Sequence, residues 1–210
     1  MGPGYGNDAI GGVMKFRNLA FCLLALAGLS ACSAALVPSS SNPKTKLRQA
    51  EELLYQSNRP GPAERLINEA YEIYQQRGDA EGMGDAYQLY GFFFLSQAVI
   101  NSSAVYTRAG FADGSSYENR FHSSAAYFER AAALFLKSGK FDSATSAQFN
   151  GARSHAWAGE RDKACSAFDR SLESYRKNIA ANPGVKVSLP AGYSNYEVLV
   201  RDEKTRVGCA

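Results

Sequence analysis

The chain has 210 residues and a formal net charge of +3, and its hydrophobic fraction of 45% is ordinary for a globular protein. Acidic and basic residues are interspersed, so no run of Lys and Arg marks a nucleic-acid surface or a polybasic membrane surface. Composition therefore favours one folded domain with extensions and gives no indication of a nucleic-acid partner.

The N-terminal segment has the features of a secretion signal. Lys15 and Arg17 precede an apolar run over residues 19–29, which as a helix would span only about 16 Å, roughly half of a hydrocarbon core. That length is typical of the hydrophobic region of a signal peptide. Because Met14 stands directly before Lys15, we predict a signal peptide over residues 1–31 with Met14 as its natural start.

The segment ends with Leu29, Ser30, Ala31 and Cys32, which resemble the bacterial lipobox of a branched residue, two small residues and a cysteine. The resemblance implies that Cys32 is acylated and becomes the first residue of the mature chain, with buried acyl chains as a membrane anchor. Ser33 follows in place of an aspartate, which in such lipoproteins indicates the outer membrane, facing the periplasm. The alternative is an ordinary secretion signal that ends beside an unrelated cysteine.

Helical periodicity begins after a tether rich in Ser, Ala and Pro, which we place at residues 32–44. The sequence at 58–62 breaks the first helix, and Pro62 can lie in the first turn of the second. Gly78 is placed to end that second helix and Asp79 to cap the next. The apolar positions of these two helices are Leu47, Ala50, Leu53 and Leu54, then Leu66, Ile67, Ala70, Ile73 and Tyr74.

A third helix is expected over residues 80–99, followed by the least helical internal segment at 101–114. The sequence at 115–118 resembles a capping box, which would start a long helix that ends near Lys137. Gly139 follows as the stop.

Two more helices are expected at residues 143–158 and 161–179. The tail at 181–210 begins irregularly, and residues 194–206 favour either a short capped helix or, by the alternation of their apolar residues, a strand. No other run favours a sheet. We therefore predict an all-α fold built from antiparallel helix pairs with short loops.

The helix pairs share one spacing of small and bulky residues. In the last pair, Ala152 is followed by Ala164, Phe168 and Ser171 at steps of twelve, four and three positions. This pattern resembles the tetratricopeptide repeat, in which small residues mark the close approach of two helices and an aromatic residue fills the gap beside them.

The other two pairs repeat this spacing with departures. The first pair has Glu51 in place of the first small residue and Ile67 in place of the aromatic one, and in the middle pair Gly91 precedes Ser124 by 33 positions instead of twelve. The resemblance covers residues 44–177, although the signature Trp and the terminal Pro of the family are absent. It implies an α-solenoid of about three helical hairpins over 45–180, with an insertion in the middle repeat. The positions concerned are Glu51, Ala63, Ile67 and Ala70, then Gly91, Ser124, Phe128 and Ala131.

Two cysteines remain once Cys22 leaves with the signal peptide and Cys32 is acylated. Cys165 and Cys209 form an even pair in an oxidising compartment, so we expect a disulfide that pins the C-terminal tail to the helices. The alternative is two free thiols.

The sequence gives little support for catalysis. It contains two histidines, His122 and His155, and His155 stands beside Ser154 without the Gly-x-Ser-x-Gly turn of a nucleophile. We interpret His155 as a packing residue near Ala152 and His122 as a polar helix residue. No metal-ligand motif or phosphate-binding loop is present, so we expect no enzyme activity, no metal and no cofactor.

The tetratricopeptide resemblance implies that the first helix of each pair lines a concave groove that holds a peptide or a helix of another protein. Carried over position by position, the groove residues are Gln88, Phe92 and Leu95 in the middle pair and Phe149, Asn150, Arg153 and Trp157 in the last pair. Tyr106, Phe111 and Tyr117 in and beside the insertion are a second set, equally suited to an interface or to packing on the scaffold.

These observations together predict a non-catalytic scaffold or assembly factor that is lipid-anchored at the outer membrane and binds envelope proteins. The alternative is a lipoprotein that holds a small ligand, such as a peptidoglycan fragment, between the groove and the insertion.

Overall fold

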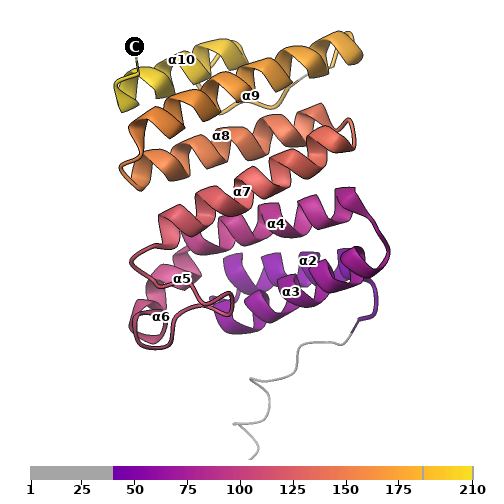
Figure 1. Cartoon of the computed structure of the whole chain (residues 1–210), viewed down its shortest axis with the longest axis vertical. Coiled ribbons are helices and arrows are strands. Elements are labelled where there is room, and N and C mark those ends of the chain that lie inside the picture. The colour runs from indigo at the N-terminus through magenta and orange to yellow at the C-terminus, as the bar shows by residue number, and fades with distance from the viewer. Residues whose placement is uncertain (1–39, 186, 210) are drawn as a thin grey trace, which may run out of the picture. The chain divides into compact units, whose positions relative to one another are not determined.

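The computed structural model describes residues 40–185 and 187–209, all within the second of two compact units, which covers residues 40–210. The predicted signal peptide, Cys32 and the tether up to residue 39 lie outside the described residues. Within the described ranges the regular structure is entirely α-helical, which confirms the predicted all-α class (Figure 1). The helices are α2 (Pro43–Tyr55), α3 (Pro60–Gln76), α4 (Ala80–Leu95), α5 (Gln97–Asn101), α6 (Ser103–Ala109), α7 (Arg120–Lys137), α8 (Phe141–Trp157), α9 (Arg161–Ala181) and α10 (Tyr196–Val207).

The helices pack in chain order, as three antiparallel pairs (Figure 1). Helix α2 packs on α3, α4 on α7 and α8 on α9, while α3 against α4 and α7 against α8 join the successive pairs. The short helices α5 and α6 lie between the two members of the middle pair in the sequence. The fully buried positions at this repeated spacing are Ala63, Ile67, Ala70, Ser124, Phe128, Ala131, Ala164, Phe168 and Ser171.

Local signals at the helix ends act as the sequence predicts. Asp79 caps α4 by accepting a hydrogen bond from the Gly82 backbone N–H at 2.9 Å, and Gly78 before it has the positive φ of +66° that favours glycine. Helix α3 begins at Pro60, two positions before the proline expected in its first turn. In the first pair, Ala50 is fully buried whereas Glu51 is exposed, so Ala50 supplies the small packing residue.

The middle pair packs so closely at Gly91 that this position admits no side chain. A Cβ atom added to Gly91 on α4 would lie 2.9 Å from the ring of Phe128 on α7. The Ser124 hydroxyl donates to the Gly91 carbonyl oxygen at 2.9 Å and also lies 2.9 Å from the Ser154 hydroxyl of α8. These contacts explain why small residues occupy the repeated positions: the helix backbones approach each other directly.

The third predicted helix is not continuous to residue 99. It ends at Leu95, because Ser96 adopts an extended conformation with ψ at 147°, and α5 then starts a new direction. The Ser96 hydroxyl accepts from the Val99 N–H at 3.3 Å and so caps α5.

The segment at 101–114 is more ordered than its composition predicts, since it contains α6. Tyr106 and Phe111 stack at 4.4 Å between ring centroids, and Phe111 also contacts Phe94 of α4 at 4.8 Å. Both insertion aromatics are buried, so they pack on the scaffold and are not exposed anchors. Burial of these rings against α4 overrides the weak helical tendency of the segment.

The predicted capping box at 115–118 is wrong. Helix α7 starts later, at Arg120, and its preceding residue Asn119 makes no side-chain cap. The Ser115 hydroxyl donates instead to Asp113 at 2.6 Å and stabilises a turn of the insertion.

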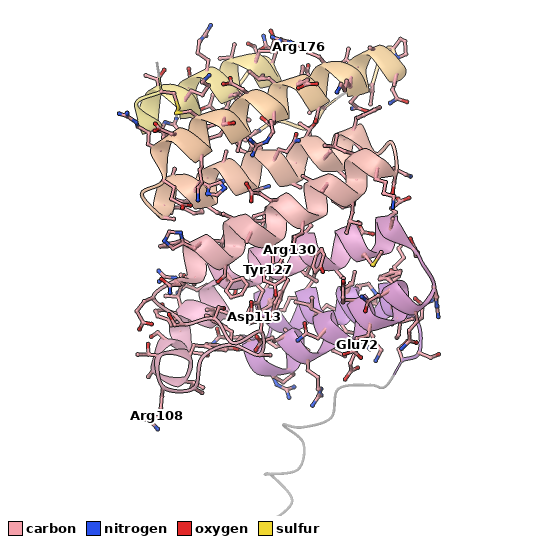
Figure 2. All side chains as sticks on the ribbon, viewed as in Figure 1. Glu72, Arg108, Asp113, Tyr127, Arg130 and Arg176 are labelled. Carbon is pink, nitrogen blue, oxygen red and sulfur yellow. A yellow bond between two sulfur atoms is a disulfide. The ribbon has the colours of Figure 1, made fainter. Side chains whose placement is uncertain are left out.

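Two carboxylates hold the insertion in place. Glu64 on α3 is buried and accepts hydrogen bonds from the Tyr90 hydroxyl at 2.7 Å and from the Ala112 backbone N–H at 2.8 Å. Asp113 accepts from the hydroxyl of Tyr127 on α7 at 3.0 Å, and Figure 2 shows these two side chains directed toward each other. The insertion is thereby bonded to helices on both sides of it.

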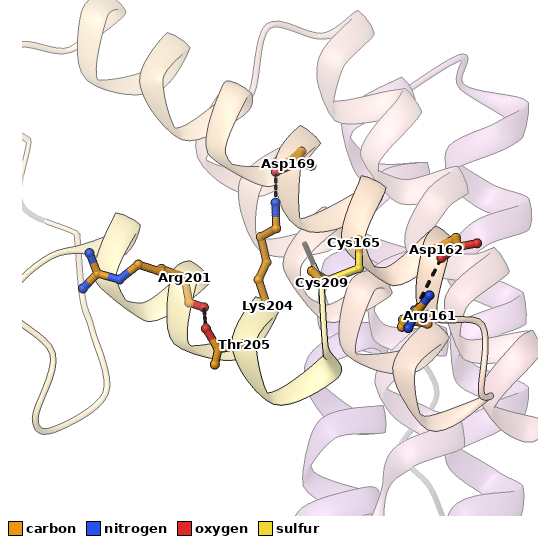
Figure 3. Close-up of a disulfide and its surroundings, with 8 residues drawn as sticks. All are labelled: Arg161, Asp162, Cys165, Asp169, Arg201, Lys204, Thr205 and Cys209. Atoms are coloured by element: carbon orange, nitrogen blue, oxygen red, sulfur yellow. Dashed lines mark hydrogen bonds and ion pairs between the residues drawn. A yellow bond between two sulfur atoms is a disulfide. The ribbon is translucent and has the colours of Figure 1, made fainter.

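The C-terminal tail contains a helix, not a strand. Asn195 caps α10 by accepting a hydrogen bond from the Val198 N–H at 2.9 Å. The tail is covalently attached to α9 through the disulfide between Cys165 and Cys209, whose Cα atoms lie 5.7 Å apart (Figure 3). An ion pair between Lys204 and Asp169, at 2.6 Å, also links α10 to α9. The buried residues of α10 that pack near Phe168 are Tyr196, Leu199 and Val200.

Candidate functional site

Three of the predicted groove residues form a stripe on α8. Phe149, Arg153 and Trp157 recur at intervals of four and therefore lie on one side of the helix. The tail covers one end of this stripe, because the Phe149 ring lies 5.9 Å from Tyr196 of α10 and 5.6 Å from Phe168 of α9. Phe149 is thereby half-buried beneath α10, and its role in a groove stays a prediction.

The other end of the stripe opens into a cavity of about 470 Å³ between α8, the turn after it and the last turns of α10. Trp157 is 47% exposed at this cavity, although it is the largest apolar side chain in the chain. The Arg153 guanidinium lies 4.9 Å from its ring and the Phe121 ring lies 5.9 Å from it. We name this cavity the Trp157 cleft; its lining is Arg153, Ala156, Trp157, Gly159, Arg161, Phe168, Glu203, Arg206 and Val207.

The Trp157 cleft has a surplus of positive charge. Arg153, Arg161 and Arg206 line it, whereas Glu203 is its one carboxylate. Glu203 pairs with Arg206 at 2.7 Å, so it neutralises a guanidinium that already belongs to the cleft. Arg161 lies 3.5 Å from Asp162, which is outside the lining (Figure 3), whereas the Arg153 guanidinium lies over the indole ring. An indole surface beside the Arg153 guanidinium is suited to a segment that presents an apolar side chain next to an acidic one.

A second cavity, of about 360 Å³, lies between α2 and α4 and contains two more predicted groove residues, Gln88 and Phe92. The Phe92 ring packs edge-on against Phe128 at 4.9 Å. The carbonyl oxygen of the Gln88 side chain is buried and has no hydrogen-bond partner within residues 40–185 and 187–209. Two cations and two anions line it, so its formal charge is balanced, unlike that of the Trp157 cleft. The lining residues are Lys44, Leu47, Arg48, Glu51, Asp85, Gln88, Leu89 and Phe92.

Asp85 in this second cavity titrates unusually. Although the residue is exposed at the surface, partial desolvation by the surrounding protein raises its pKa to about 6, and the negative charges of Glu81 and Asp79 add to the increase. The carboxyl group therefore changes charge within the range of mildly acidic conditions. No sequence motif marks this residue, because the shift depends on its packing.

The remaining predicted groove residues contribute less. Leu95 is half-buried on α4 and lines neither cavity. The Asn150 amide donates to the Ser146 carbonyl oxygen of its own helix at 2.9 Å, which engages its donor within α8. Four of the predicted groove residues thus line two separate cavities, and α10 covers Phe149 in part.

His155 is buried, as expected for a packing residue, but it is also bonded on both sides. Its Nδ1 lies 2.7 Å from Glu160 and its Nε2 lies 3.1 Å from Glu129. Hydrogen bonds from Lys163 and then from His155 lower the pKa of Glu160 to about 2. This arrangement ties α7, α8 and the turn before α9 together, and sequence reasoning missed it because the two carboxylates lie far apart in the chain.

Comparison with protein-family models, with curated proteins and with solved structures finds no match to this chain. No helix in the described ranges is long and apolar enough to cross a membrane. Among those same residues, no group of three or more His, Cys, Asp and Glu side chains is arranged to hold a metal ion.

Proposed function

We propose that this protein is a non-catalytic docking module that binds an acidic, apolar-anchored segment of another protein in the Trp157 cleft. The observation that carries the proposal is the half-exposed indole of Trp157, flanked by Arg153 in a cleft with surplus positive charge. Tryptophan and arginine are the residues that most often dominate protein–protein binding energy, typically within a pocket such as this one.

The helical scaffold is, on this proposal, a tetratricopeptide-like α-solenoid with an insertion in its middle repeat. The successive packing of three helix pairs and the complete burial of the small residues at the repeated spacing support this assignment. The helix α10 then serves as a terminal cap, which shields Phe149 and the end of the array from solvent.

We further propose that a lipid on Cys32 holds the module at the outer membrane on the periplasmic side, where its partners are envelope proteins. The lipobox-like sequence supports this location, and the bond between Cys165 and Cys209 suits an oxidising compartment.

The test is affinity purification of the full chain from detergent-solubilised envelopes, with Trp157→Ala and Arg153→Ala variants beside the wild type. Tyr55→Ala is the matched control, because Tyr55 is a 60% exposed aromatic residue on α2, away from the cleft. We expect the wild type and the control to recover the same partner and Trp157→Ala to lose at least tenfold of it.

Equal recovery by Trp157→Ala and by the control would refute the assignment of this cleft. A Cys32→Ala variant separately tests the lipid anchor. Loss of the acylated cysteine should release the protein from the membrane fraction without weakening its binding to the partner in solution.

A further inference from the structure

A third cavity, of about 270 Å³, lies where α7, α8 and α9 meet, and it is lined by residues of α8 other than those of the Trp157 cleft. Small residues form much of its wall, and Leu136 at its edge is 38% exposed. The full lining is Glu129, Ala132, Ala133, Leu136, Ala147, Gln148, Gly151, Ala167 and Arg170.

Gln148 distinguishes this cavity from a mere packing gap. Its side chain is only 7% exposed, and its carbonyl oxygen is buried without a hydrogen-bond partner among the described residues. Nearly all buried polar atoms in folded proteins are hydrogen-bonded, so an unpartnered acceptor in a cavity wall needs an explanation. A bound group that donates one hydrogen bond to the Gln148 oxygen is such an explanation.

The charged groups of the wall are already partnered. Arg170 lies 3.6 Å from Glu129, and Glu129 also lies 3.1 Å from the Nε2 of His155. Because these charges neutralise one another, the cavity favours an uncharged occupant. The Gln148 oxygen then selects among uncharged groups by requiring a donor.

The volume limits the size of that occupant. Cavities for drug-sized ligands start at about 300 Å³, so this one is suited to a single small ring system. Alanine and glycine walls leave flat apolar surface, against which an aromatic ring packs with little loss of conformational freedom.

We propose that this cavity binds one aromatic ring system that carries an N–H or O–H donor, with the donor bonded to Gln148 Oε1 and the ring between the alanines of α7, α8 and α9. The ring is either that of a free small molecule or the Trp or Tyr side chain of a partner. This site is independent of the Trp157 cleft and of the function proposed for it.

The test compares indole with benzofuran, which has nearly the same shape but lacks the N–H donor. Binding is followed in ¹⁵N–¹H spectra of the full chain carrying Cys32→Ala, which removes the predicted acylation site and avoids detergent. We expect both probes to perturb the amides of Gly151 and Ala132, and indole to bind about fivefold more tightly.

Gln148→Leu should abolish that preference by weakening indole alone, and Gln148→Met is the second variant should the first not fold. Gln88→Leu is the matched control, because its amide oxygen is likewise buried and unpartnered but lines the cavity between α2 and α4. The control should keep the fivefold preference.

Absence of saturable binding at these amides, equal affinity of the two probes, or a preference that survives in Gln148→Leu would each overturn the proposal. A tryptophan-containing peptide that binds more tightly than indole, and depends on Gln148, identifies a partner chain as the source of the ring. Binding of indole with exclusion of the peptide identifies a free molecule.

Discussion

Breaking the disulfide between Cys165 and Cys209 should be the most informative perturbation of this fold. The bond spans 44 positions of sequence. In the chain-entropy model, a closed loop of that length restricts the unfolded chain by about 13 cal/mol/K, or about 4 kcal/mol at 25 °C. We therefore expect the Cys165→Ser, Cys209→Ser double variant to lose up to about 4 kcal/mol of the free energy of unfolding.

The loss should begin locally. Without the bond, α10 is held by the buried contacts of Tyr196 and its neighbours and by exposed ion pairs such as Arg176 with Glu197, which contribute little each. Hydrogen exchange of the α10 amides should therefore accelerate more than that of α4 or α7. Trp157 is the single tryptophan, and because α10 lines its cleft, its fluorescence should report the change directly.

The assay is urea unfolding, followed by circular dichroism and by tryptophan fluorescence, for the wild type and the double variant. A matched variant that replaces Lys204 by Met removes the neighbouring ion pair while keeping the disulfide, and should cost about 1 kcal/mol or less. A double variant that unfolds within about 1 kcal/mol of the wild type, with unchanged exchange in α10, would refute the reasoning.

Three further substitutions test the packing of the core at Gly91 and the shifted pKa values of Glu64 and Glu160. Gly91→Ala should lower the free energy of unfolding in urea by about 1–3 kcal/mol, because the added methyl group meets the Phe128 ring. Gly61→Ala is the control and should be neutral or stabilising, since no atom lies within 4 Å of the added methyl group. Equal effects of the two substitutions would contradict the close packing at Gly91. Burial raises the pKa of Glu64, so the contribution of this carboxyl group to the free energy of unfolding is fully present below the unfolded pKa near 4.5 and is lost as the pH rises through the folded pKa. Glu64→Gln should flatten that part of a plot of the free energy of unfolding against pH. An unchanged plot would argue against burial of the charge. The pKa of Glu160 is lowered to about 2, so the contribution of this carboxylate to the free energy of unfolding is present above about pH 4.5 and is lost as the pH falls toward 2. Glu160→Gln should remove this loss of stability in acid. A loss that persists in the variant would be due to other groups.

Much of the helical framework was predictable because its signals are local. The apolar stripe of α3, the positive φ at Gly78 and the cap at Asp79 depend on residues within a few positions of each other. The spacing of Gly91 and Phe128 also identified a close approach of two helices, although not which atoms meet.

Long-range packing decided what local signals could not. The insertion appeared irregular in the sequence because nothing nearby shows that Tyr106 and Phe111 bury against α4 or that Glu64 accepts from Ala112. The capping box failed for a related reason, since Asp113 is the partner that Ser115 finds in the folded chain.

The candidate site was likewise predictable from the sequence only in part. The side of α8 shared by Arg153 and Trp157 follows from their positions in the sequence, since a spacing of four places them on one face of a helix. Long-range packing sets the partial cover of α10 over Phe149 and the open cleft beside Trp157. It also buries the Gln148 oxygen with no hydrogen-bond partner in the described part of the chain. The physical reason is that exposure and hydrogen-bond satisfaction depend on segments distant in the chain, which periodicity along one helix does not encode.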